Sequence, residues 1–251
     1  MTVATPALRL VAAGAASLLG VAILAALGTW QLHRKGWKED LIATLERRFA
    51  AAPMPLPRPE AWPALTSADM EFRRVRFTAE FLHDQEALVY TAGSVLRSDA
   101  TGPGYWVFTP ARLIDHALVM VDRGFVPEGR QDPARRPDGR VTGPVEIVGV
   151  LRWPERPGWF NPSPDVARNL WFVRDPVAIA AAKDLGAVAP FYVEQESPLP
   201  PGGLPSPAKL KVNLPNNHAQ YVITWFGLAA ALAAVYTAYA IAQWRASAAS
   251  P

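Results

Sequence analysis

The 251-residue chain contains no cysteine. Disulfide bonds and thiolate metal sites are therefore excluded, and so is a covalent c-type haem, whose thioether bonds need two cysteines. Histidine is scarce as well, with four residues at positions 33, 83, 116 and 218. None of these has a second histidine at the helical spacing of a zinc site. His83, beside Asp84, and His116, beside Asp115, are expected in solvent-exposed loops.

The common enzyme motifs are also missing. There is no Gly-x-Ser-x-Gly elbow, no phosphate-binding loop and no dinucleotide-binding glycine pattern, and the chain has no internal repeat. The formal net charge is only +3. In the arginine-rich stretch 122–140, five arginines are interspersed with four acids, which predicts a solvated loop rather than an anion site. These features indicate neither a nucleic-acid-binding protein nor a nucleophilic enzyme.

Two long apolar segments dominate the sequence. The 18 residues from Leu10 to Leu27 carry no charge, and as a helix they cover most of a ~30 Å hydrocarbon core. The stretch from Tyr221 to Ala242 has aromatic residues near both ends, as in an interfacial belt. We predict membrane spans at 8–30 and 217–243. The alternatives are buried core helices and, for the first segment, a removable signal peptide, although signal peptides have apolar regions of only ~7 to 15 residues.

The region between the spans changes character along its length. Residues 31–50 are predicted to continue the first helix, with Trp30, Arg34, Trp37, Leu41 and Leu45 on one face. Residues 51–70 form a proline-rich linker. Residues 71–215 contain short alternating stretches that predict an antiparallel β-rich domain, barrel- or sandwich-like. The strand candidates are VRFTAEF, ALVYTAGSV, GYWVFTPARL, HALVMVDRGFVP, VEIVGVLRWP, LWFVRD, FYVEQE and KLKVNL. A short helix is expected in RDPVAIAAAKDLG, capped by Asp175 and ended at Gly186.

The position of His218, at the start of the second predicted span, suggests a function. Asn216 or Asn217 can cap the second span and place His218 in its first turn. Tyr221 and Trp225 then share its helical face. A neutral imidazole has a lone pair for iron, and aromatic neighbours suit a flat apolar macrocycle. The alternative is an interfacial histidine that bonds to lipid headgroups or to the domain.

Five sequence blocks, in this order, resemble the surfeit locus protein family. They are LGTWQLHRKGWKEDLI, GPGYWVFTP, VDRGFVP, GVLRWPERPGWFNPSPDVARNLWFVRD and LPNNHAQYVITWF. The resemblance extends from Leu27 to Phe226. Two positions depart from the family pattern: Phe125 stands where tryptophan is common, and Ala219 where a larger apolar residue is common. These departures affect expected partner contacts more than the fold.

The resemblance implies an assembly factor for cytochrome c oxidase in the cell inner membrane. It implies two transmembrane helices that flank an extracytoplasmic domain, periplasmic in bacteria, with both termini in the cytoplasm. The factor would bind haem a and assist its insertion into the large oxidase subunit without catalysing a reaction. Haem a synthase is a further possible partner beside the large subunit and the lipid bilayer, and no nucleic acid is implied.

The resemblance also assigns roles to individual residues. His218 aligns with the proposed haem ligand, and Trp30, Gln31 and Arg34 match the block at the exit of the first span. Arg34 or Lys38 could bind haem propionates, with lipid phosphate contact as the alternative. His33, outside the matched motif, could supply a second axial ligand.

Two other functions stay open on the sequence. One is a haem-free structural adaptor that stabilises an oxidase assembly intermediate, in which the histidine only packs. The other is an extracytoplasmic sensor or hydrolase domain, which the missing nucleophile and metal motifs disfavour.

Overall fold

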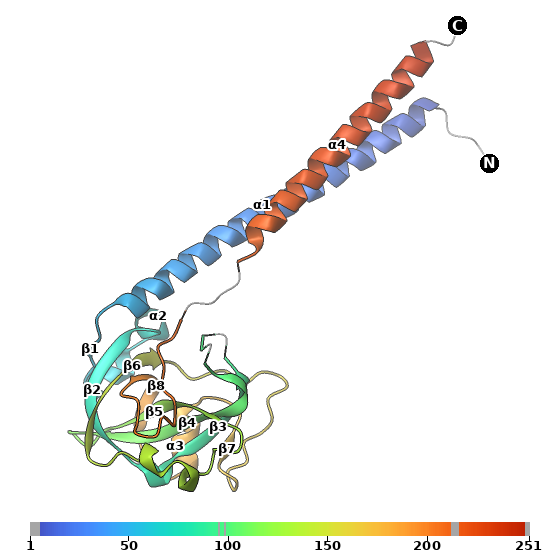
Figure 1. Cartoon of the computed structure of the whole chain (residues 1–251). Helices are drawn as coiled ribbons and strands as arrows, with labels where there is room; N and C mark the ends of the chain where they lie inside the picture. Colours follow the sequence, from blue (N-terminus) through green and yellow to red (C-terminus); the bar gives the residue numbers. More distant parts are fainter. Residues whose placement is uncertain (1–5, 95, 98, 212–215, 249–251) are drawn as a thin grey trace. The chain divides into compact units, whose positions relative to one another are not determined.

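The computed structural model describes residues 6–94, 96, 97, 99–211 and 216–248 (Figure 1). The chain divides into two compact units. We call Met1–Ala43 with Leu214–Pro251 the helical unit, and Thr44–Asn213 the barrel domain.

The helical unit is built from α1 (Pro6–Ala50), up to Ala43, and α4 (His218–Ala248). Both helices are long and apolar enough to cross a membrane, and 0% and 6% of their most apolar windows are buried inside the protein. That exposure is unlike a core helix of a soluble protein. The predicted layout of two long apolar helices around a β domain is confirmed. The predicted continuation of the first helix is confirmed as well, since α1 has no proline after Pro6 and ends three residues before Pro53.

Glycines on α1 bring the two helices close together. A Cβ atom on Gly28 would lie 2.9 Å from the Phe226 ring, and one on Gly20 would lie 2.8 Å from Leu232. Such small residues allow close helix packing in membranes. Among the buried and half-buried positions of the two helices, one set recurs in alternating steps of four and three residues, as in a left-handed coiled coil. On α1 these positions are Leu10, Gly14, Ser17, Val21, Leu24, Gly28, Gln31, Lys35 and Lys38; on α4 they are His218, Val222, Trp225, Ala229, Leu232 and Tyr236.

The barrel domain is organised around five strands that close on themselves. These are β2 (Arg74–Phe81), β6 (Pro144–Arg152), β8 (Val188–Ser197), β5 (Leu118–Pro127) and β4 (Thr101–Leu113), paired in that order, with β2 also paired to β4. The sheet is extended by β1 (Met54–Pro55) beside β2, by β3 (Ala87–Gly93) beside β4, and by β7 (Leu170–Trp171) beside β3. The predicted β-rich domain is therefore a barrel. Most pairs are antiparallel, but β1–β2, β3–β7 and β5–β8 are parallel.

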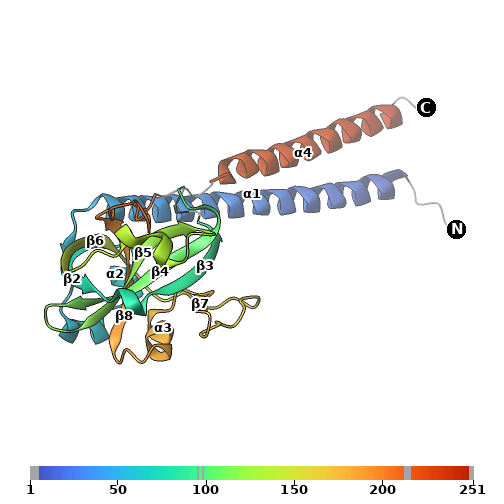
Figure 2. The same ribbon diagram turned by 60° about the horizontal axis from the view of Figure 1, so that its bottom comes forward.

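Several short helices connect the strands. They are η1 (Pro59–Ala64), α2 (Ser67–Met70), η2 (His83–Gln85), η3 (Pro133–Arg135), η4 (Pro137–Gly139) and α3 (Pro176–Ala182). In α3 the Asp175 carboxylate accepts hydrogen bonds from the amides of Val177 and Ala178, as predicted for its cap. The helix ends at Ala182, four residues before Gly186. α3 packs against β8 (Figure 2).

Strand alternation produces two separate apolar cores. On β5 and β8, Val121 and Val193 face the barrel interior, and Met120 and Tyr192 face the opposite side. The interior core also includes Trp62 and Met70, so the segment predicted as a proline-rich linker contributes core side chains. The outer core includes Trp106, Phe108, Trp171 and Ile179. The outer faces of β5 and β8 are therefore covered by a second layer.

Two predicted strands differ from the structure. In KLKVNL, residues 209–211 form no strand, and 212–214 lie outside the described residues. In LWFVRD only Leu170 and Trp171 are paired as a strand, because the chain then turns to bring Arg174 onto Glu155.

Candidate functional site

The first candidate site is in the helical unit, where His218 contacts Gln31. The Nδ1 atom of His218 lies 2.7 Å from Oε1 of Gln31, which is buried on α1 with 9% of its surface exposed. α4 begins at His218, and the carbonyl of Asn217 accepts from the amide of Tyr221. The predicted first-turn position is confirmed. The predicted side-chain cap is not made by Asn216, whose Oδ1 is buried without a hydrogen-bond partner among the described residues.

This contact sets the tautomer of the imidazole. Because the amide oxygen of Gln31 can only accept, Nδ1 carries the proton and donates it. The Nε2 atom then has a lone pair that points away from Gln31. A histidine whose second ring nitrogen is fixed in this way is a typical metal ligand. The Nε2 atom of His218 could therefore hold a haem iron.

The other predicted site residues are placed around this pair with different exposures. Trp225 is on the α4 face that packs on α1, and its Nε1 atom is buried without a partner in the described part of the chain. Tyr221 and Trp30 are exposed, at 51% and 57%. Trp30 belongs to the predicted helical face of α1, on which Trp37 and Leu41 are exposed as well. The one buried member of this face is Leu45, which lies in the barrel domain.

The basic residues that follow Gln31 on α1 differ in their contacts and exposure. The guanidinium of Arg34 lies 4.1 Å from the centre of the Trp37 ring, in a cation–π contact. Lys38 recurs one heptad after Gln31 and is half-buried. His33 is exposed and lies about 200° around the helix from Gln31. The structure thus brings together His218 and Gln31, and does not bring His33 to them.

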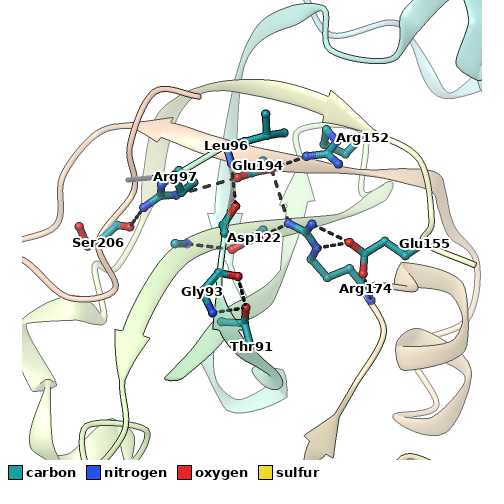
Figure 3. Close-up of polar contacts among 12 residues, drawn as sticks. Thr91, Gly93, Leu96, Arg97, Asp122, Arg152, Glu155, Arg174, Glu194 and Ser206 are labelled. Atoms are coloured by element: carbon teal, nitrogen blue, oxygen red, sulfur yellow. Dashed lines mark hydrogen bonds and ion pairs between the residues drawn. The ribbon is translucent and has the colours of Figure 1, made fainter. Parts of the chain in front are cut away.

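The second candidate site is a charged network in the outer layer of the barrel domain (Figure 3). Asp122 on β5 and Glu194 on β8 are paired across neighbouring strands and are 0% and 1% exposed. Three arginines surround them: Arg97, Arg152 and Arg174. Arg152 Nη1 binds Glu194 at 2.8 Å, and Arg174 Nη2 binds Glu155 at 2.6 Å. Two buried carboxylates are thus held by a shared set of guanidinium groups.

Some contacts in this network are too long for hydrogen bonds. Arg174 Nη1 lies 3.7 Å from Glu194 and 3.9 Å from Asp122, and Arg97 Nη1 lies 4.0 Å from Glu194. Arg97 is also tied to the segment around Ser206, because its Nη2 donates to the Ser206 carbonyl at 2.7 Å. The network therefore joins strands β5, β6 and β8 to the segments that contain Arg97, Arg174 and Ser206.

The pKa of Asp122 is strongly raised within the network. Burial and the neighbouring charge of Glu194 raise the pKa of Asp122 to about 7, against the opposing influence of Arg174. The ordinary pKa of aspartate is 3.8. Between these values the folded chain holds a proton that the unfolded chain has lost, so stability falls as pH rises through this window.

We therefore expect Asp122→Asn to weaken this decline. Asparagine keeps the Oδ1 acceptor that binds the Gly124 amide at 3.0 Å, and it carries no charge to bury. The free energy of unfolding, measured in urea between pH 4.5 and pH 7.5, should fall less in the variant than in the wild type. Glu80→Gln removes an exposed carboxylate from β2 and serves as the control. An undiminished decline in Asp122→Asn would contradict the assignment.

Two predictions about charged loops are wrong. His83 is half-buried in η2: Nε2 donates to the Val141 carbonyl at 2.8 Å and Nδ1 accepts from Arg123 at 3.2 Å. Burial lowers the pKa of His83, against the Val141 bond, and the charge of Arg123 adds to the lowering. The stretch 122–140 is likewise not a solvated loop, since Arg123 and Arg136 are 2% and 4% exposed and Arg136 pairs with Glu86. The prediction for His116 is confirmed, because it lies exposed in the β4–β5 turn.

Comparison with known proteins identifies the family of this chain. The model of the SURF1 family matches residues 18–230, which is most of the chain. The chain belongs to the SURF1 family. A SURF1-like protein of Monosiga brevicollis is 36% identical over 229 residues, covering 88% of this chain and 85% of the relative. Surfeit locus protein 1 of Rattus norvegicus is 36% identical, with coverage of 82% and 68%, and that of Homo sapiens is 35% identical, with coverage of 82% and 70%.

Both candidate sites lie within the region that the SURF1 family model covers. The blocks that resembled the family in the sequence supply Gln31 and His218 to the helical unit. They also supply Asp122, Arg152 and Arg174 to the charged network. Sequence reasoning missed that network, although one signal was present. The run ALVMVDRGFV is apolar on both strand faces, which indicates a strand buried on both sides and therefore a buried Asp122.

Among the described residues, no group of three or more His, Cys, Asp or Glu side chains is placed to hold a metal ion. A metal at the helical unit would thus depend on the single nitrogen of His218 together with its own macrocycle or a further ligand.

Proposed function

We propose that this SURF1 family protein is an assembly factor for cytochrome c oxidase that binds haem a and assists its insertion into the large oxidase subunit. The observation that supports haem binding is the bond between Nδ1 of His218 and Gln31, which reserves Nε2 for iron. Haem supplies the redox-active iron of the oxidase when bound, and the protein itself would hold and orient it. We assign no catalysed reaction to the chain.

Other residues of the helical unit would complete the haem site. Trp225 offers an apolar ring on the face of His218, with an Nε1 donor that has no partner among the residues the structure describes. Tyr221, one turn after His218, and Trp30, next to Gln31, present exposed rings. The cationic groups of Arg34 and Lys38 would bind propionate oxygens through charge-assisted hydrogen bonds.

We further propose that the protein resides in the cell inner membrane, with α1 and α4 as its spans. Both ends would lie in the cytoplasm and the barrel domain in the periplasm. The partners would be the large oxidase subunit and haem a synthase.

The test is the optical spectrum of protein purified from cells that make haem a. The wild type should show a Soret band, and His218→Ala should lose it while remaining membrane-inserted, because the nitrogen that would hold the iron is gone. Gln31→Leu should lower haem affinity by about 10- to 100-fold, since the hydrogen bond that orients the imidazole is gone. Gln31→Glu keeps an acceptor for Nδ1–H and should retain haem.

His33→Ala is the matched control, since it removes an exposed imidazole from the same part of α1. It should keep the wild-type spectrum. Unchanged haem content in His218→Ala would disprove the ligand assignment. If that protein also crosslinked normally to the large subunit in haem-free cells, the chain would be a structural adaptor instead.

A further inference from the structure

The loop between β6 and β7 presents two aromatic side chains that touch almost nothing. Trp159 and Phe160 are 101% and 99% exposed. A soluble surface seldom exposes two adjacent large apolar side chains completely, and such features mark interaction sites. Nothing in the proposed haem site uses them.

The backbone that carries them is nevertheless well held. Trp159 and Phe160 are the central residues of a turn in which the Asn161 amide donates to the Gly158 carbonyl at 3.1 Å. The Gly158 amide in turn donates to Oδ1 of Asn161 at 2.9 Å, and Nδ2 of Asn161 donates to the Phe172 carbonyl at 3.0 Å. Central turn positions usually hold small or polar residues. This turn instead holds two aromatic rings outward on an ordered backbone. Binding would therefore cost little conformational entropy of the backbone.

The surroundings of the turn are apolar and basic. A cavity of about 300 Å³ beside it is lined largely by prolines and aromatic rings: Pro157, Pro162, Pro164, Trp171 and Phe172. Of the nearby acids, Glu155 pairs with Arg174 and Asp165 with Arg168, and the Asp175 carboxylate caps α3. In the described structure, Arg156 is exposed and has no carboxylate within salt-bridge distance. The turn therefore combines two aromatic anchors with an uncompensated positive charge.

We propose that Trp159 and Phe160 insert into the headgroup region of the bilayer. We favour a lipid surface as the partner, because the two apolar helices would tether the barrel domain to a membrane. Tethering keeps the local concentration of lipid high. Tryptophan and phenylalanine favour the membrane interface, and Arg156 suits anionic headgroups. The turn thus acts as a second, peripheral membrane contact of the barrel domain.

The absence of cysteine allows a direct test on the full-length, haem-free protein. Phe160→Cys creates a single thiol at the turn, and Ile114→Cys creates one on the β4–β5 turn, where Ile114 is 86% exposed. Each is labelled with an environment-sensitive fluorophore and reconstituted into vesicles of phosphatidylcholine and phosphatidylglycerol. The label at 160 should be blue-shifted, and quenched severalfold more by spin-labelled lipid than by aqueous iodide, with the reverse order at 114.

Two results would overturn the proposal. One is quenching of the label at 160 by iodide to the same extent as the label at 114. The other is a label that is aqueous in these vesicles and becomes protected only when the large oxidase subunit is added, which would make the turn a protein-docking surface. Replacing the phosphatidylglycerol by phosphatidylcholine should weaken lipid quenching at 160, and Arg156→Gln should abolish that dependence.

Discussion

Arg174→Met is expected to destabilise the barrel domain by about 3–5 kcal/mol, the range for removing one partner of a buried ion pair. The Arg174 side chain is 15% exposed and faces Glu155, Asp122 and Glu194. Methionine is of similar length, so packing is largely kept while the charge is lost. The loss arises because two buried carboxylates keep their desolvation cost with less compensation.

Urea unfolding at pH 7.5, followed by circular dichroism in detergent, would measure this loss. Arg168→Met is the matched control, because the Arg168 side chain is 83% exposed and its contact with Asp165 is 3.5 Å. It should change stability by no more than about 0.5 kcal/mol. The double variant Arg174→Met with Asp122→Asn should recover part of the loss, since one of the stranded charges is removed. A loss in Arg174→Met no larger than in the control would show that the network is not held by charge.

Gly124→Ala is expected to cost about 2–5 kcal/mol, through backbone strain and steric overlap together. Gly124 has φ +115°, and a Cβ atom there would lie 2.0 Å from the Ser206 carbonyl oxygen and 2.3 Å from its carbon. These are backbone atoms that cannot rotate away. Phe125 and Ser206 exchange two backbone hydrogen bonds, of 3.0 and 2.9 Å, directly beside Gly124. The new methyl group would force this bridge apart.

Thermal and urea unfolding of Gly124→Ala can be compared with Gly129→Ala. Gly129 also has a positive φ, +84°, but in the described part of the chain no neighbouring atom lies within 4 Å of a Cβ placed there. The control therefore isolates the conformational cost, about 1–2 kcal/mol. Equal losses in the two variants would show that the approach of Ser206 to Gly124 is not rigid.

Local sequence patterns predicted the elements well where local forces decide them. The apolar runs gave both long helices, and Asp175 with Pro176 gave the start of α3. Period-two alternation located β2, where Val75, Ala79 and Phe81 are buried. KLKVNL failed because residues 209–211 follow prolines at 205 and 207, and the Lys211 amide donates to the Leu96 carbonyl rather than to a strand.

The charged network could not be predicted in the same way. In VEQE, the alternation of Val193 and Glu194 suggests a strand with one face in water, yet Glu194 is 1% exposed. What buries it is a second layer from distant parts of the chain, which local periodicity does not reveal. Sequence reasoning named His218 and Gln31 as candidates, but the bond between them depends on how α4 is aligned along α1.

The glycines of α1 consequently influence chemistry at a distance from their own contacts. Gly20 and Gly28 fix the alignment of α4 on α1 through Leu232 and Phe226, and this alignment sets Gln31 opposite His218. A displacement of α4 by one residue would rotate the imidazole by about 100° relative to Gln31 and leave either ring nitrogen free to carry the proton. Packing between side chains within the apolar spans thus selects which nitrogen of a histidine at their polar end is a base.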